Sequence, residues 1–577
     1  MTVLNGIVGS QGYGSGAAVV KRQKVPDPAR YTIDNVAAEK QRFRDAQATC
    51  DARMIGLLED SVGAGDEAAE IIKAYLVILR DEAFFKKALD RLEPEMANIE
   101  YLIWDECQKV MAQFAALDDP YLRERAVDIE NVCNELIRTM LGLEYEFFIE
   151  PKLGNDIVVV ASDLTPAETM KMDKSYLRGF VTEKGGATSH TVILAKALGI
   201  PAVTGVEGVL EAVSDGDFLL LDAFCGEVTV NPDPVCKAAF QARSSHYCEK
   251  QKQYAQNASQ PAVTLDGFRV DVNINTGDAE SMRAFDCGAC DGVGLFRTEF
   301  IYMNHSGYPD EETQYAIYSG LAAKAGGKEV IIRTLDIGGD KQLGYMCLPR
   351  EENPFLGYRA IRLCLDRQDV FLTQLRAILR AAVHGNVKIM FPMIVNTEEL
   401  RQAKGCVEKA KESLARDGLP FRPDIPIGIM VETPAAVLLS DKLAQEADFF
   451  SIGSNDLIQY TTATDRMNER VQHLYDSCNL SVLRSIHMVA ESAKKASIPW
   501  GICGEVASED RLIPVWVAMG VSELSVSPSL VPKVKHLIRQ VNKAQLTPEV
   551  GRVLAMSGID EVKRELGAIL SRLEGIS

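Results

Sequence analysis

Hydrophobic and polar positions divide the chain into two parts with different periodicity. Between about residues 20 and 145, apolar side chains recur at helical spacing on a background rich in Glu, Lys, Arg and Ala, which predicts a group of helices. From about residue 155, short apolar runs of strand length alternate with helical segments. We expect the early runs and the glycine-rich first 20 residues to form one α/β unit, into which the helices are inserted. These runs are 157–161, 180–182, 218–222 and 227–230.

Eight further apolar runs recur in the last part of the chain, most of them separated by segments of helical pattern. Eight strands that alternate with helices favour a closed (β/α)8 TIM barrel. No apolar run approaches the roughly 20 residues that a membrane-spanning helix requires. The eight runs are 270–274, 292–296, 330–334, 387–393, 425–431, 449–453, 500–503 and 524–527.

The expected fold class is therefore a multidomain α/β protein: an α/β domain with an inserted α-helical subdomain, followed by a TIM barrel. A stretch with little apolar content lies between the two and predicts an exposed linking helix. The expected boundaries are 1–20 and 146–231 for the α/β domain, 21–145 for the helical subdomain, 232–260 for the linker helix and 261–577 for the barrel domain.

Composition and charge exclude several classes of function. The 577 residues include 62 Lys and Arg against 81 Asp and Glu, a formal net charge of −19. A nucleic-acid partner is disfavoured, because such binding draws its affinity from Lys and Arg that neutralise phosphates. The first basic residue is Lys21, so the start of the chain lacks the charged region of a secretory signal. Thirteen scattered cysteines do not suggest a disulfide framework, and we expect a cytoplasmic protein.

Polar and charged residues gather where the predicted barrel strands end, and barrel active sites lie at those C-terminal ends. One charge after a strand is usually a solvated turn, but polar residues after almost every strand are hard to assign to chance. Arg297 and Arg333 end two of the runs, and Arg359 and Arg466 lie on loops. Their guanidinium groups suit carboxylate and phosphate oxygens.

Three other residues at these strand ends add metal binding and acid chemistry. Glu432 and Asp456 offer the hard oxygen ligands that Mg²⁺ prefers, usually as one or two protein carboxylates beside the substrate's own oxygens. The Cys503 thiol is mostly protonated near neutral pH if its pKa stays near ~8.5, so it can donate a proton. Together these residues predict a site for a small, multiply charged anion on a metal ion, with an acid beside it.

A second candidate site is His190, which follows the glycine turn at Gly185 and Gly186. The turn leads into a predicted helix, and a helix N-terminus favours a phosphoryl group through its free N–H groups and dipole. A neutral imidazole is a good nucleophile toward phosphorus, and Thr169 or Ser189 could orient the ring or bind the phosphate. A helix-capping turn that carries a histidine without a function is the alternative.

Several segments resemble motifs of the phosphoenolpyruvate-utilising enzymes. Gly-Gly-Ala-Thr-Ser-His-Thr (185–191) is similar to the family's phosphohistidine motif, and Gly-Val-Gly-Leu-Phe-Arg-Thr-Glu-Phe (292–300) is similar to part of its barrel. Length, order of the parts and the helical insertion resemble the enzyme I branch of the bacterial sugar phosphotransferase system, over essentially the whole chain. Further segments that carry the resemblance are 333–341, 351–362, 430–436, 449–457 and 501–505.

The resemblance implies a phosphoenolpyruvate-protein phosphotransferase whose α/β domain swivels. It implies Mg²⁺ on Glu432 and Asp456, a phosphohistidine at His190 and proton donation by Cys503 to the enolate, which gives pyruvate. Phospho-His190 would pass its phosphoryl group to the histidine-containing phosphocarrier protein HPr, docked on the helical subdomain, in the first step of sugar uptake. The family is homodimeric through the barrel. The implied phosphoenolpyruvate-binding set is Arg297, Arg333, Arg359, Asn455, Asp456 and Arg466.

The sequence also departs from the usual enzyme I pattern and leaves alternatives open. Ala187 stands in place of an arginine, Gln11 in place of a proline, Ser454 in place of a threonine, and residues 476–480 in place of a proline-containing loop. A dikinase is disfavoured, because the chain has neither the length for an ATP-binding domain nor a glycine-rich phosphate loop. The alternatives are a non-sugar paralogue that acts on a different phosphocarrier, a non-catalytic carrier-binding regulator, and a Mg²⁺-dependent lyase that uses the barrel alone.

Overall fold

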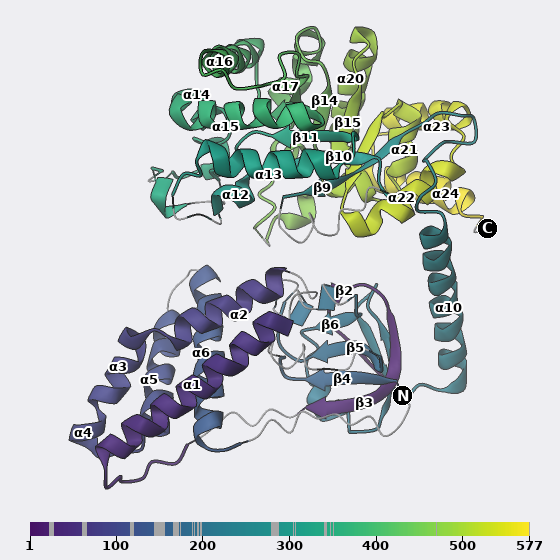
Figure 1. Cartoon of the computed structure of the whole chain (residues 1–577). Helices are drawn as coiled ribbons and strands as arrows, with labels where there is room; N and C mark the ends of the chain where they lie inside the picture. The colour runs from purple at the N-terminus through teal and green to yellow at the C-terminus, as the bar shows by residue number, and fades with distance from the viewer. Residues whose placement is uncertain are drawn as a thin grey trace. The chain divides into compact units, whose positions relative to one another are not determined.

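The chain folds into two compact units in the computed structural model, residues 1–247 and 248–577 (Figure 1). The structure describes the whole chain except residues 22–27, 61–65, 116–119, 144–155, 165–171, 173–174, 187–188, 190, 193–194, 197–198, 278–287, 304, 306, 340–342, 347, 350, 469 and 576–577.

The first unit is built on an eight-stranded mixed sheet in the order β1-β8-β7-β3-β4-β5-β6-β2. β3 pairs in parallel with β4, so the start of the chain joins the same sheet as the predicted later strands. Alternate residues of β4 enter two different apolar clusters, Val158 and Val160 in one, Ile157 and Val159 in the other. Burial of both faces explains the unbroken apolar run. The strands are β1 (Thr2–Asn5), β2 (Ile7–Ser10), β3 (Tyr13–Lys21), β4 (Ile157–Ala161), β5 (Leu177–Thr182), β6 (Ala202–Thr204), β7 (Phe218–Asp222) and β8 (Glu227–Val230).

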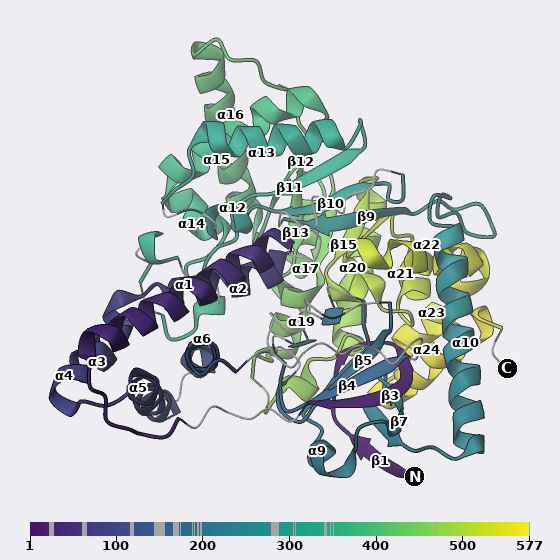
Figure 2. The same cartoon turned by 60° about the horizontal axis from the view of Figure 1, so that its bottom comes forward.

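Between β3 and β4 the chain forms helices with an apolar core of their own. Cys50, Leu79, Leu102 and Leu136 from four of these helices are fully buried in one cluster. α5 and α6 pack side by side (Figure 2). The helices are α1 (Val36–Asp60), α2 (Asp66–Leu79), α3 (Glu82–Asp90), α4 (Leu92–Glu95), α5 (Ile99–Ala115) and α6 (Pro120–Met140); α9 (Val209–Ala212) follows β6, and α10 (Pro234–Gln256) follows β8.

The second unit is a closed barrel of eight parallel strands, as the apolar runs predict. α13, α15 and α16 lie side by side outside β10 to β12 (Figures 1 and 2). The strands are β9 (Asp271–Thr276), β10 (Gly292–Arg297), β11 (Glu329–Arg333), β12 (Asn386–Phe391), β13 (Ile427–Val431), β14 (Phe450–Gly453), β15 (Trp500–Cys503) and β16 (Glu523–Val526).

The helices of this unit follow the barrel strands or close the chain. Within the described part of the chain, none of the helices combines the length and apolar character that a bilayer span requires. The α-helices are α12 (Glu299–Met303), α13 (Glu311–Lys324), α14 (Ile361–Asp366), α15 (Gln368–Ala381), α16 (Thr397–Arg416), α17 (Pro434–Leu438), α18 (Ser440–Leu443), α19 (Ser454–Thr462), α20 (Leu480–Ala496), α21 (Ile513–Met519), α22 (Val531–Gln540), α23 (Lys543–Ala555) and α24 (Ile559–Leu573), with short 3₁₀ helices at Gly344–Met346, Pro354–Leu356, Ala382–His384, Gln472–Leu474, Glu505–Ser508 and Pro528–Leu530.

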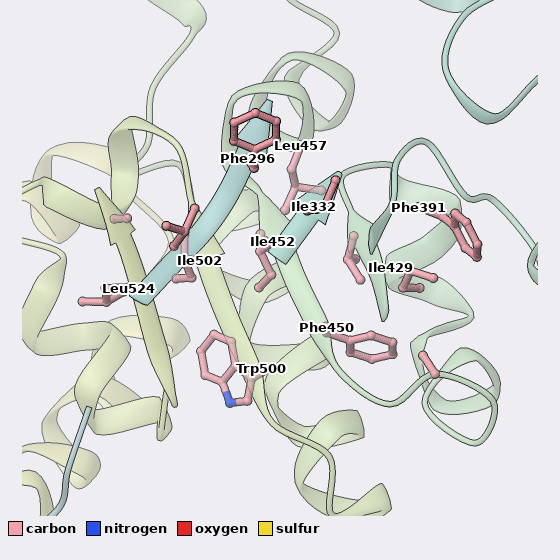
Figure 3. Packing of buried hydrophobic residues seen from close by; sticks show 14 of the residues in the cluster. Phe296, Ile332, Phe391, Ile429, Phe450, Ile452, Leu457, Trp500, Ile502 and Leu524 are labelled. Atoms are coloured by element: carbon pink, nitrogen blue, oxygen red, sulfur yellow. The ribbon is translucent and has the colours of Figure 1, made fainter. Parts of the chain in front are cut away.

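The two-residue period of the barrel strands sorts side chains into an outer and an inner set. Outward residues pack in the same cluster as the surrounding helices, and Figure 3 shows Phe450, Ile452 and Trp500 among them. The inner set forms a separate cluster of Leu295, Ile331, Met390, Met430, Phe449 and Cys503. Continuing the alternation by two residues from Leu295, Ile331 and Met430 reaches Arg297, Arg333 and Glu432. The same period that fills the barrel therefore directs these polar side chains to its C-terminal mouth.

Candidate functional site

Two arginines stand next to each other where β10 and β11 end. Arg297 and Arg333 are partners in the strand register, with Arg297 half-buried and Arg333 only 7% exposed. Arg333 donates a hydrogen bond from Nη2 to Glu299 and lies with Nη1 3.0 Å from Oδ2 of Asp336. Burial opposes the charge of Arg333, but the neighbouring carboxylates of Glu299 and Asp336 outweigh it and raise the pKa of Arg333 above its ordinary value. The guanidinium therefore stays charged although it is largely inaccessible to solvent.

A third arginine, Arg359, joins the strand ends to α19. It is 5% exposed, and its Nη2 donates to Oδ1 of Asp336 at 2.8 Å and to Oδ2 of Asp456 at 3.0 Å. Arg466, on the loop after α19, places Nη1 3.5 Å from Oδ1 of Asp456. Arg333, Asp336, Arg359, Asp456 and Arg466 therefore form one chain of alternating charges at the barrel mouth.

Glu432 follows β13 directly and is nearly inaccessible, at 1% exposed. Its Oε1 accepts a hydrogen bond from the N–H of Met393 at 2.6 Å. The carboxyl group lies against Gly453, where a Cβ atom would be 2.6 Å from Oε2 of Glu432. Burial raises the pKa of Glu432 to about 8, with Asp456 adding to this shift and Arg333 opposing it. A cation bound nearby would stabilise the ionised form of this buried carboxyl group.

The fit of a divalent cation rests on the oxygens of Glu432 and Asp456. Asp456 is 7% exposed, and its buried Oδ1 accepts no hydrogen bond from the described residues. No group of three or more His, Cys, Asp and Glu side chains gathers for a metal in the described part of the chain. Two carboxylates, completed by oxygens of the substrate, match the way proteins usually hold Mg²⁺.

Cys503 ends β15 and belongs to the inner barrel cluster. Its Sγ donates to the carbonyl oxygen of Ile452 at 3.4 Å and accepts from Oγ of Ser451 at 3.5 Å. Burial raises the pKa of the thiol to about 11, although Ser451 and Arg333 act in the opposite direction. At neutral pH the group therefore carries its proton, as a proton donor must.

Asn455 is half-buried at the start of α19, next to the helix's acidic residue. Its side-chain oxygen accepts weakly from the N–H of Glu505 at 3.4 Å, and its own carbonyl accepts from the hydroxyl of Tyr475 at 3.2 Å. The same oxygen accepts from the hydroxyl of Ser454 at 3.5 Å, and among the described residues the side-chain N–H₂ donates no hydrogen bond.

In the first unit, His190, Thr169 and Ala187 lie outside the described residues. Gly185 has φ +101°, and a Cβ there would lie 3.1 Å from Oγ of Ser189, so this glycine permits a tight turn. The N–H of Ser189 donates to the carbonyl of Gly186 at 3.1 Å, and helical structure begins at Thr191. The described residues around position 190 therefore form a glycine turn that leads into a helix.

Sequence reasoning assigned no role to Glu299 and Asp336, although both are almost fully buried beside the arginines. Each follows an arginine closely, at two and three residues beyond a strand end. An acidic residue just past an arginine in a buried strand end is the signal that could have identified them. Ser451 had no comparable signal, because its contact with Cys503 depends on the pairing of β14 with β15.

Comparisons with known proteins give a consistent picture. The family models for the PEP-utilising enzyme N-terminal, mobile and PEP-binding domains match residues 5–125, 153–226 and 251–543. The phosphoenolpyruvate-protein phosphotransferase of Priestia megaterium is 39% identical over 554 residues, covering 95% of this chain and 96% of that protein. The enzyme of the same name from Bacillus subtilis is 36% identical over 557 residues, covering 96% and 97%. The Staphylococcus aureus enzyme is 37% identical over 554 residues, covering 95% and 96%.

Proposed function

This chain belongs to the family of phosphoenolpyruvate-utilising enzymes and is a phosphoenolpyruvate-protein phosphotransferase, and from that premise we propose roles for the residues at the barrel mouth and for His190. Phosphoenolpyruvate binds on the arginines with Asn455 and Asp456, and His190 takes its phosphoryl group. The arginines are Arg297, Arg333, Arg359 and Arg466. One observation carries this assignment: Arg333, Glu432 and Cys503 converge at one end of the barrel, where the charges of Arg333 and Glu432 both act on the Cys503 thiol.

Binding and transfer depend on charges that are in place before the substrate arrives. The guanidinium groups bind the carboxylate and phosphate oxygens and hold the phosphorus in line with the attacking imidazole nitrogen. Glu299 and Asp336 hold Arg333 in place before phosphoenolpyruvate arrives, which lowers the cost of binding it. The P–O bond to the enolate oxygen breaks as the N–P bond to His190 forms. Mg²⁺ bound by Glu432 and Asp456 would neutralise charge on the phosphoryl and enolate oxygens.

Cys503 completes the reaction by protonating the enolate. Its S–H bond breaks as a C–H bond forms at the methylene carbon, which becomes the methyl group of pyruvate. The hydroxyl of Ser451 and the charge of Arg333 then stabilise the thiolate that remains. The raised pKa supports this role only in that the thiol is protonated at neutral pH and so has a proton to donate.

The acceptor of the second transfer is a histidine on a phosphocarrier protein, HPr, which docks on the helical subdomain. Exposed acidic side chains on that part of the chain, such as Asp34, Asp45 and Glu93, support a basic partner. A non-sugar paralogue would use the same chemistry with a different carrier. In either case the protein acts in the cytoplasm, where phosphoenolpyruvate is available.

The barrel domain also mediates homodimerisation in this proposal. Large apolar side chains are exposed on the segments that follow its strands, and such side chains mark protein–protein contact surfaces where they gather into a patch. Each is more than half exposed: Leu356, Leu438, Met467 and Leu474.

Rapid-quench measurement of pyruvate tests the proposed roles. With Mg²⁺ and phosphoenolpyruvate, the purified chain should release a burst of pyruvate stoichiometric with protein, followed by steady turnover only when a phosphocarrier is added. His190→Ala should abolish the burst, and Arg333→Ala should abolish it with His190 intact. Continuous pyruvate release by His190→Ala would refute the role of His190, because water would then accept the phosphoryl group, and the absence of any burst in the parent chain would favour a lyase or a non-catalytic regulator.

A further inference from the structure

Asp336 is a buried carboxylate that serves two arginines at once. Its Oδ2 lies 3.0 Å from Nη1 of Arg333, and its Oδ1 accepts from Nη2 and Nε of Arg359 at 2.8 and 3.2 Å. Asp336 is 3% exposed, so water competes little for either pair. Each oxygen is thus committed to a different guanidinium, and the distance between the two arginines is set through this one side chain.

The backbone is built to bring Asp336 against Arg359. Gly338, two residues further on, has φ +115°, and a Cβ there would lie 2.4 Å from Cβ of Arg359. Only glycine permits both the conformation and the close approach. The N–H of Ala360 also donates to the carbonyl of Ile337 at 3.1 Å, which ties the two segments together.

Arg359 divides one nitrogen between two carboxylates, since its Nη2 also donates to Oδ2 of Asp456 at 3.0 Å. Its other terminal nitrogen, Nη1, donates to the hydroxyl of Tyr460 at 3.3 Å. If Asp336 lost its charge, the strongest remaining anionic partner of Arg359 in the described site would be Asp456. The guanidinium would then move toward Asp456 and compete with a cation for its oxygens.

We propose that Asp336 is a positioning residue: it holds Arg333 and Arg359 at a fixed separation for phosphoenolpyruvate and keeps Asp456 available to the metal ion. The proposal rests on the proposed roles of these three residues. Asp336 itself contacts neither substrate nor metal in this scheme and acts only through its neighbours.

The test compares Asp336→Asn with the same substitution in an exposed Asp–Arg ion pair. Asp369 pairs with Arg367 at 2.8 Å in the same unit, but its side chain is 66% exposed, so Asp369→Asn serves as the control. Binding is measured by calorimetry in chains that also carry His190→Ala, where phosphoenolpyruvate is not consumed. Mn²⁺ is the metal probe, followed by electron paramagnetic resonance with and without phosphoenolpyruvate. Turnover is measured in chains with His190 intact.

Asp336→Asn should weaken phosphoenolpyruvate and Mn²⁺ binding by about 10- to 100-fold, the range usual for residues that orient ligand-binding groups. KM for phosphoenolpyruvate should rise by a similar factor, while kcat at saturation changes by less than about threefold. Asp369→Asn should stay within about twofold of the parent in both measurements. A loss of folded protein alone would lower kcat and leave KM unchanged, so the two explanations separate.

Unchanged binding and KM in folded Asp336→Asn would overturn the proposal. If that variant does not fold, Asp336→Glu decides, because it keeps the charge but lengthens the side chain. Weakened binding by folded Asp336→Glu supports positioning, and parental binding by it refutes positioning. Failure of the parent His190→Ala chain to bind phosphoenolpyruvate would refute the site assignment itself, which is a distinct result.

Discussion

The pH dependence of Cys503 reactivity is a direct consequence of its place inside the barrel. Burial raises the pKa of its thiol to about 11. At pH 8, about 0.1% of such a thiol is ionised, against roughly a quarter of a thiol with the ordinary pKa of ~8.5. Because only the thiolate is alkylated, ionisation alone should slow the reaction of Cys503 by about 200-fold relative to free cysteine. Its 2% exposure should slow it further at every pH without changing the slope.

The assay is alkylation by iodoacetamide at pH values from 7 to 10, with each cysteine quantified by mass spectrometry of its peptide. The rate of Cys503 alkylation should rise about tenfold per pH unit over the whole range, with no plateau. The exposed Cys248 of the same chain controls for reagent and for unfolding. A Cys503 rate that levels off above about pH 9 would show a thiol with the ordinary pKa of ~8.5 and would refute the reasoning that its environment keeps it protonated.

Three further predictions concern Cys503, Glu432 and Glu523, the residue that begins β16. Cys503→Ala should leave phosphorylation of His190 largely intact and slow pyruvate formation at least 100-fold, measured by rapid quench; equal slowing of both steps would contradict a role in protonation alone. Since the pKa of Glu432 is about 8, metal binding must displace its proton, and Mn²⁺ affinity measured by calorimetry should rise by up to about tenfold per pH unit between pH 6 and 8. This pH dependence should be absent in Glu432→Gln. Burial and Glu329 raise the pKa of Glu523 to about 8, so its protonated form stabilises the fold below about pH 4.5 and that contribution is lost as pH rises through 8. The free energy of unfolding of Glu523→Gln should therefore exceed that of the parent by about 1–3 kcal/mol between pH 5 and 9. Parallel pH profiles of the two melting temperatures would exclude this.

Much of the architecture could be predicted because the buried strands coincide with short apolar runs in the sequence. The run at 157–161 coincides with β4, and the one at 500–503 coincides with β15, since both strands are buried along their whole length. The order of the strands in the first sheet could not be predicted. β2 pairs with β6 at one edge and β1 with β8 at the other, and such partners are chosen by packing rather than by any local pattern.

The candidate site could be predicted as a set of residues but not as a network. Strand ends in a barrel must meet, which is why Arg297, Arg333 and Cys503 could be grouped from their positions alone. The sharing of Arg359 between two carboxylates depends on where the loop after β11 turns, and that is decided by close backbone approach at Gly338. The thiol pKa could likewise not be predicted, because burial and neighbouring charges set it.

Phosphohistidine detection at position 190 tests the central claim most directly. The purified chain would be incubated with ³²P-phosphoenolpyruvate and Mg²⁺ in the absence of ATP, then analysed for acid-labile label and for its location by peptide mapping. The account predicts label on His190, removal of the label by pyruvate through the reverse reaction, and none in His190→Ala. Full labelling of His190→Ala, or labelling of the parent chain only when ATP is supplied, would contradict it.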